Sequence, residues 1–168
     1  ILVTFHTVTL ENNTSKKQFQ ELINAINELD DTNIIFTKTN SDSNGKIINQ
    51  MIDRYTAKYT KKSIGFTSLG QLRYLSALKY VDAVVGNSSS GLLEAPSFKI
   101  GTINIGDRQK GRIRAESVID CLAKKKDIQK SFKKLYSKNF QQLLINVNNH
   151  YDNGFSSKKI ISVLKNFN

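Results

Sequence analysis

Residues Val81–Pro96 read VDAVVGNSSSGLLEAP and join a short apolar run to a loop rich in serine. The run Ala83–Val85 is typical of a buried strand, and a short helix is predicted to open near Leu92. Backbone N–H groups at the start of a helix, with serine hydroxyls beside them, can bind a phosphate group. The sequence therefore predicts a phosphate site in this loop, at Ser88, Ser89, Ser90 and Gly91.

The same loop has a simpler explanation, in which its serines only cap the helix. Glu94, one turn further on, is likewise either a capping carboxylate or an acceptor for sugar hydroxyls. A serine hydrolase is disfavoured, because the nucleophile motif Gly-x-Ser-x-Gly does not fit. Centring that motif on Ser89 places Asn87 where its first glycine belongs, and centring it on Ser88 places Ser90 where its second belongs.

Strands and helices are predicted to alternate over about the first hundred residues. The strands are expected at Ile1–Phe5, Asn33–Thr37, Ser63–Phe66, Ala83–Val85 and Thr102–Ile105. Apolar residues at helical spacing fill the intervals, and the stretch after Gly106 turns polar and basic before a helical tail. This order indicates crossover connections, so we expect one α/β domain over residues 1–168, a Rossmann-like, doubly wound parallel sheet.

Several polar residues follow the predicted strands directly. In doubly wound sheets ligands bind beyond the carboxyl ends of the strands, so residues in those positions should meet at one edge. They are His6, Asn40, the three serines and the loop Gly106–Arg108. Arg108 could hold a phosphate through two hydrogen bonds, and His6 could donate to it or carry a proton. Each of these residues also has a simpler explanation. His6 can be structural, Asn40 can be a turn residue, and Arg112 and Arg114 can simply be solvated.

The composition is that of a globular protein, with 39% hydrophobic and 23% charged residues. No apolar run approaches the roughly 18 residues that cross a membrane. Cys121 is the single cysteine, so a reducing, cytoplasmic location is expected. The net charge of +11 raises nucleic-acid binding as a remote alternative. It is disfavoured because the lysines fall on predicted helix faces without interleaved aromatic residues that would stack on bases.

Metals and redox cofactors are not expected. His6, His150 and Cys121 are too sparse for a zinc signature. The dinucleotide fingerprint Gly-x-Gly-x-x-Gly is absent, which disfavours nicotinamide and flavin cofactors. The pairs Gly65–Gly70 and Gly106–Gly111 have the spacing of a P-loop but lack the Lys-Ser/Thr pair that follows it, so an ATPase is not supported.

Longer blocks of the sequence resemble a known family. GNSSSGLLEAP at 86–96, followed by TINIGDRQKGR at 102–112, closely resembles the hydrolysing UDP-N-acetylglucosamine 2-epimerases. The opening Leu2–His6, the loop Asn40–Asp42 and SLGQLRY at 68–74 match the same pattern, in the same order. The triple-serine form is most similar to the sialic-acid or legionaminic-acid branch, in which a modified bacterial sugar can be the substrate.

The resemblance implies a two-domain glycosyltransferase-B architecture, of which this chain would be the C-terminal, UDP-binding half. The implied reaction is elimination of UDP to a glycal-like intermediate, then hydration to free N-acetylmannosamine or a modified relative. The family's acid and base carboxylates belong to the N-terminal domain, so we expect the fragment alone to bind UDP weakly and to be inactive. A strand at the first residue, with no leader before it, also fits a piece of a longer protein, and the parent is expected to be a homodimer.

The resemblance also implies roles for single residues. Ser88, Ser89 and Arg108 would hold the diphosphate of UDP or of a UDP-N-acetylhexosamine, with His6 beside it, and Glu94 would bind the ribose hydroxyls. The remaining members of the implied substrate site are Asn40 facing the sugar nucleotide, Ser68, Leu69 and Gly70 near uracil, and Ser90, Gly91, Gly106 and Arg112. The main alternative is the donor-binding half of a UDP-sugar glycosyltransferase, which shares the fold and the diphosphate site.

Overall fold

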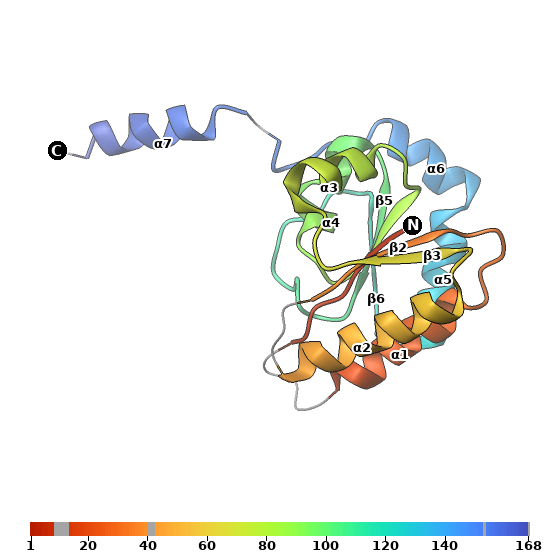
Figure 1. Cartoon of the computed structure of the whole chain (residues 1–168). Coiled ribbons are helices and arrows are strands. Elements are labelled where there is room, and N and C mark those ends of the chain that lie inside the picture. The colour runs from red at the N-terminus through yellow and green to blue at the C-terminus, as the bar shows by residue number, and fades with distance from the viewer. Residues whose placement is uncertain (9–13, 40–42, 153, 168) are drawn as a thin grey trace.

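The computed structural model, which describes residues 1–8, 14–39, 43–152 and 154–167, contains a six-stranded sheet in the order β3-β2-β1-β4-β5-β6 (Figure 1). Neighbouring strands pair in parallel throughout, as predicted. The strands are β1 (Leu2–Thr4), β2 (Ile34–Thr37), β3 (Ser63–Phe66), β4 (Ala83–Gly86), β5 (Gly101–Ile105) and β6 (Val118–Cys121). The order runs outward from β1 on one side and from β4 on the other, so the switch point of the sheet lies between β1 and β4.

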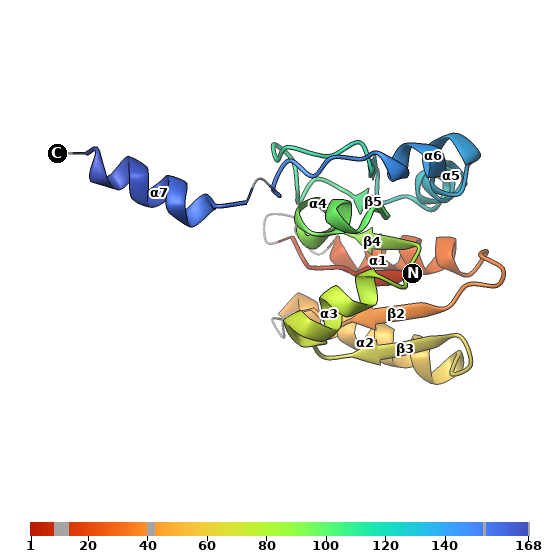
Figure 2. The ribbon, with the colours of Figure 1, turned by 90° about the horizontal axis from the view of Figure 1, so that it is seen from above.

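Helices cover both faces of the sheet, as Figure 2 shows from above. One face carries α1 (Ser15–Ile26), α2 (Ser43–Lys58) and α5 (Lys125–Leu135), and α6 (Lys138–Ile145) packs at its end. The other face carries α3 (Gly70–Leu78), the short α4 (Ser90–Leu93) and the 3-10 helix η1 (Ala95–Phe98). The doubly wound α/β prediction is therefore confirmed.

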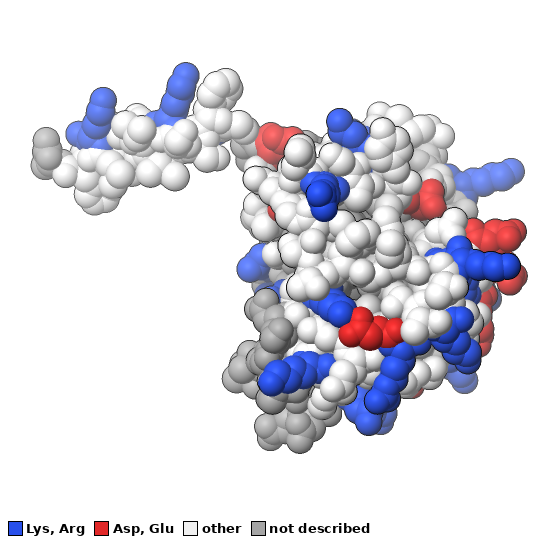
Figure 3. All heavy atoms as spheres, in the orientation of Figure 1, with Lys and Arg blue, Asp and Glu red and all other residues white. Residues whose placement is uncertain are grey.

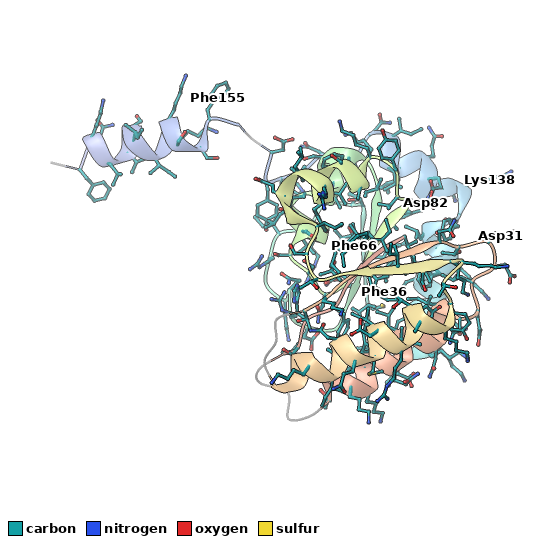
Figure 4. All side chains as sticks on the ribbon, in the orientation of Figure 1. Asp31, Phe36, Phe66, Asp82, Lys138 and Phe155 are labelled. Carbon is teal, nitrogen blue, oxygen red and sulfur yellow. The ribbon has the colours of Figure 1, made fainter. Side chains whose placement is uncertain are left out.

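Alternate residues of the central strands belong to two separate cores. Val3 and Val85 lie in the larger core with the aromatic rings of α1 and β2, among them Phe36, which points toward α2 in Figure 4. Leu2 and Val84 face the smaller core under α3 and η1. Because side chains alternate across a strand, a run that is apolar at every position is what a sheet covered on both faces requires.

The strand β6 was not predicted, since a polar, basic stretch was expected after Gly106 and a helical tail after that. Only Ile119 of this strand is buried, and Asp120 is exposed at the edge of the sheet. A four-residue edge strand with one fully buried residue carries too little periodic signal to be recognised locally. The helix α4 also begins at Ser90, two residues before the predicted start.

The last helix, α7 (Ser156–Lys165), extends away from the body of the domain (Figure 1). All of its residues are exposed, and the large apolar ones are Ile160, Ile161, Val163 and Leu164, followed by Phe167. Phe155, just before the helix, is exposed as well (Figure 4). Among the helices that the structure describes, none is long and apolar enough to cross a membrane.

Candidate functional site

The loops that leave β1 and β4 are joined at the switch point through Asn87. Its side chain is 1% exposed. The Oδ1 atom accepts from the backbone N–H of His6 at 2.6 Å, and the Nδ2 group donates to the backbone carbonyl of His6 at 2.8 Å. Gly86, with φ of 136°, allows this approach, because a Cβ there would lie 2.0 Å from the carbonyl oxygen of Thr4.

A cavity of about 480 Å³ opens beside these loops at the carboxyl ends of the strands. Of the predicted site residues, seven line it: His6, Ser68, Leu69, Gly70, Ser88, Ser90 and Glu94. The meeting at one edge that strand order predicts is thus observed in this cavity for His6, Ser88 and Ser90, while their roles as ligand contacts remain predictions. Asn40 lies outside the described residues.

The serine loop is arranged differently from a simple helix cap. The side chain of Ser89, at the cap position of α4, makes no capping hydrogen bond. Ser88 Oγ instead accepts from the backbone N–H of Ser90 at 3.4 Å and from its hydroxyl at 3.2 Å. Within the described part of the chain, the N–H groups of Ser88 and Ser89 and the hydroxyl of Ser89 donate to no protein acceptor. These donors are therefore available to a ligand.

The loop after β5 is tied to the same asparagine. The backbone carbonyl of Asn87 accepts from Arg108 Nη1 at 3.0 Å and from Gln109 Nε2 at 2.8 Å. Gly106, with φ of 74°, starts this loop, and its N–H donates to the carbonyl of Cys121 at 2.9 Å. Three loops, following β1, β4 and β5, thus meet at Asn87.

Positive charge gathers beside this junction. Burial lowers the pKa of His6, and the nearby charge of Arg108 lowers it further. Burial also lowers the pKa of Arg108, with Arg112 as a second cause. The Nδ1 atom of His6 lies 3.1 Å from the hydroxyl of Thr39. An anion bound here would relieve the repulsion between these groups.

Glu94 faces the cavity as a free carboxylate. It makes no capping hydrogen bond at the start of η1, so the capping alternative is not observed. No hydrogen bond or ion pair is formed by its carboxylate to the residues that the structure describes. Burial raises the pKa of Glu94. A half-buried carboxylate without a partner is suited to accept hydrogen bonds from ligand hydroxyls.

Two predicted glycines have structural reasons to be glycine. A Cβ on Gly91 would lie 2.5 Å from Cγ2 of Thr102, so α4 can approach β5 only without a side chain there. The Thr102 hydroxyl donates to the carbonyl of Gly91 at 2.8 Å. Gly70 has φ of 64° at the start of α3, and its N–H donates to Ser68 Oγ at 3.1 Å.

Sequence reasoning missed several residues that shape the site. Gln109, in a basic stretch, is 1% exposed. The hydroxyls of Thr4 and Thr37, from neighbouring strands, are 2.5 Å apart at the floor of the cavity. Tyr74 reaches the cavity from α3 and hydrogen-bonds the hydroxyl of Ser90. Tyr74, Gln109 and Thr4 each lie in a block that resembles the family, whereas Thr37 does not.

A second cavity, at the opposite edge of the sheet, differs from the first in the charge of its lining residues. It has a volume of about 710 Å³ and is lined mainly by uncharged residues together with three aspartates, of which Figure 4 labels Asp31 and Asp82. Lys and Arg side chains are dispersed over the face shown in Figure 3, several of them next to Asp or Glu. This distribution supports the interpretation of solvated helix faces. His6 lines the first cavity. Arg108 and Arg112 do not line it, but the charge of Arg108 acts on His6 and that of Arg112 acts on Arg108.

Comparisons with known proteins identify the family of this chain. Residues 1–165 match the family described as UDP-N-acetylglucosamine 2-epimerase. The chain is 44% identical over 141 residues to a GDP/UDP-N,N'-diacetylbacillosamine 2-epimerase (hydrolyzing) of Campylobacter jejuni, covering 84% of this chain and 36% of that protein. It is 36% identical over 170 residues to the polysialic acid biosynthesis protein P7 of Escherichia coli, covering 99% and 42%. The chain spans less than half the length of these relatives.

Solved structures share the fold. The S. aureus MnaA–UDP structure has a TM-score of 0.74 at 17% identity and covers 99% of this chain and 44% of that one. The Neisseria meningitidis UDP-GlcNAc 2-epimerase bound to UDP-GlcNAc has a TM-score of 0.76 at 16% identity, covering 98% and 44%. The family match over nearly the whole sequence and the identity to the curated relatives decide the classification. The chain belongs to the UDP-N-acetylglucosamine 2-epimerase family.

Proposed function

We propose that this chain is the UDP-binding half of a hydrolysing UDP-sugar 2-epimerase. The observation that carries the proposal is the junction at Asn87, which brings the loops of His6, Ser88 and Arg108 to one edge of the sheet. The diphosphate would accept from the free donors of Ser88 and Ser89 and would face the charge of Arg108. Hydrogen bonds to a charged acceptor contribute about 1.5–3 kcal/mol each, so a few suffice for a specific site.

The nucleoside is assigned to the cavity beside the serine loop. The free carboxylate of Glu94 would accept from the two ribose hydroxyls, and the loop Ser68–Gly70 would border the uracil. A volume of about 480 Å³ is in the range of small-molecule sites. Two of the similar structures hold UDP or UDP-GlcNAc, which supports the same ligand class here.

In the whole protein we assign this half to the leaving group. When the bond between the sugar C1 and the diphosphate oxygen breaks, the electron pair leaves with UDP, and negative charge grows on the diphosphate. Donors already aimed at that oxygen stabilise the developing charge. A carboxylate of the other half would take the proton from C2, which gives a glycal-like intermediate, and addition of water releases the 2-epimeric free sugar, N-acetylmannosamine or a modified relative.

The second half of the parent enzyme is the proposed partner of α7. The apolar side chains Ile160, Ile161 and Leu164 are exposed, although such residues are normally buried against another surface. The curated relatives are more than twice as long as the region that they share with this chain. We infer that the remainder of such a protein is the partner of α7. We expect the chain truncated after residue 152 to keep its stability and its UDP affinity, because α7 contacts neither core. A loss of either would contradict this assignment.

Titration of the chain with UDP, UMP and uridine tests the function. We expect affinity to fall in that order, because each step removes a phosphate. Arg108→Gln should weaken UDP binding by about tenfold while leaving uridine unaffected. Arg54→Gln, at an exposed position on α2, is the matched control and should change neither. Equal affinity for UDP and uridine, or tighter binding to duplex DNA that falls steeply with salt, would contradict the proposal.

The parent enzyme distinguishes the epimerase from the transferase alternative. We expect it to release UDP and a free N-acetylhexosamine from the UDP-sugar with no acceptor present. A transferase consumes the UDP-sugar only when an acceptor hydroxyl is supplied. Acceptor-dependent consumption would therefore contradict the epimerase assignment and leave the UDP-binding role in place.

A further inference from the structure

Three hydroxyls form a chain along one wall of the cavity. The phenol of Tyr74, on α3, hydrogen-bonds Ser90 Oγ, and the Ser90 hydroxyl donates to Ser88 Oγ at 3.2 Å. All three residues line the cavity. These hydrogen-bonded hydroxyls, called the hydroxyl chain below, therefore connect α3 to Ser88 in the loop after β4.

The donors and acceptors of this chain have only one consistent direction. A hydroxyl has one proton and two lone pairs. Both lone pairs of Ser88 Oγ are used, by the N–H of Ser90 at 3.4 Å and by its hydroxyl. Because Ser90 gives its proton to Ser88, its own oxygen accepts from Tyr74. Burial raises the pKa of Tyr74, so the phenol keeps the proton that it donates.

The hydroxyl chain ends at the proton of Ser88. It has no acceptor among the residues that the structure describes. With both lone pairs occupied, Ser88 can take part in a further hydrogen bond only as a donor. A site with that polarity selects an acceptor such as a phosphate oxygen and rejects a ligand hydroxyl that needs to donate.

We propose that Tyr74 is a positioning residue, which acts through Ser90 to aim the Ser88 proton at the diphosphate. The proposal rests on the proposed function for its ligand. Without the phenol, the Ser90 hydroxyl loses its donor and can turn away, and Ser88 can then donate to Ser90 instead of to the ligand. Hydrogen bonds in a chain also polarise one another, so the Ser88 proton becomes a better donor.

A double-mutant cycle on UDP affinity tests the coupling. Tyr74→Phe keeps the ring and should weaken UDP binding about fivefold, and Ser88→Ala should weaken it about tenfold. If Tyr74 acts through Ser88, the double variant binds UDP as Ser88→Ala does. If the double variant instead loses UDP affinity by the product of the two single losses, Tyr74 acts independently of Ser88 and the proposal is overturned. Tyr80→Phe, at a tyrosine that is 88% exposed at the opposite edge, is the matched control and should bind UDP normally.

Proton NMR of the unliganded chain tests the hydroxyl chain without UDP. We expect a slowly exchanging, downfield phenol proton that is absent in Tyr74→Phe, shifted in Ser90→Ala and unchanged in Tyr80→Phe. Absence of this resonance from the wild-type chain would overturn the proposal. Failure of the wild-type chain to bind UDP would instead contradict the proposed function, and the resonance would then decide the hydroxyl chain by itself.

Discussion

The side-chain amide of Asn87 and the backbone of His6 exchange two hydrogen bonds, of 2.6 and 2.8 Å, across 81 residues of sequence. The pair fixes the loop after β1 to the loop after β4. The carbonyl of Asn87 accepts from Arg108 and Gln109, so the same residue also fixes the loop after β5. The proposed anion site thus depends on one buried asparagine that contributes no positive charge.

Replacement of Asn87 by alanine should lower the free energy of unfolding by about 2–4 kcal/mol, because the N–H and carbonyl of His6 lose their partners. Urea denaturation measures this loss, and Asn146→Ala, at an exposed position after α6, serves as the control. Asn87→Asp should weaken UDP binding further than alanine does, since it places a carboxylate beside the diphosphate. Unchanged stability in Asn87→Ala would show that the pairing is dispensable.

UDP binding should be coupled to protonation of His6. Burial and Arg108 hold the pKa of His6 below 6.5, so the folded chain favours the neutral imidazole. The stability that this provides is present above pH 6.5 and is lost as the pH falls through the folded pKa. A bound diphosphate should raise that pKa, and UDP affinity should therefore increase from about pH 7.5 to about pH 6.

NMR titration of the His6 ring measures this coupling, with His6→Gln identifying the resonance. Arg108→Gln should raise the pKa of His6 in the free chain, because it removes a positive neighbour. A pKa of His6 that is the same with and without UDP would place the diphosphate elsewhere.

Glu94→Gln should stabilise the chain while weakening UDP binding. The folded pKa of Glu94 is raised by burial, so the stability linked to its protonation is present below about pH 4.5 and is lost as the pH rises through the folded value. The stability difference between the variant and the wild type should therefore grow from about pH 4 to pH 7. Glu116→Gln, at an exposed position, should show neither effect. Full UDP affinity in Glu94→Gln would remove Glu94 from the ribose site.

Gly91→Ala should cost about 1–3 kcal/mol of stability, because its Cβ would press on Cγ2 of Thr102 and push α4 from β5. Thr102→Ser removes that methyl group and keeps the hydroxyl that donates to Gly91. Thermal unfolding of the double variant should thus recover most of the loss. An equal loss with and without Thr102→Ser would show that the contact does not govern the position of α4.

The sheet was predictable because Ala83–Val85 is apolar at every position, as a strand covered on both faces requires, and because strand-like and helix-like stretches alternate along the chain. The edge where the loops meet followed from strand order alone. The hydrogen bonds within the site could not be predicted, because Asn87, Tyr74 and Gln109 meet their partners only after the loops come together. A buried glutamine in a basic stretch has the same local sequence signature as a solvated one. The strand β6 escaped prediction because it is only four residues long and Ile119 is its one fully buried residue.

Amide NMR mapping of UDP on the chain tests most directly whether the switch point holds the diphosphate. Saturable shifts are predicted at His6, Asn87–Ser90 and Arg108, with smaller ones at Ser68–Gly70 and Glu94. Inorganic pyrophosphate should reproduce the first group and not the second. Shifts centred on the other cavity, at Tyr80 and Asp82, or no saturable shifts at all, would contradict the account.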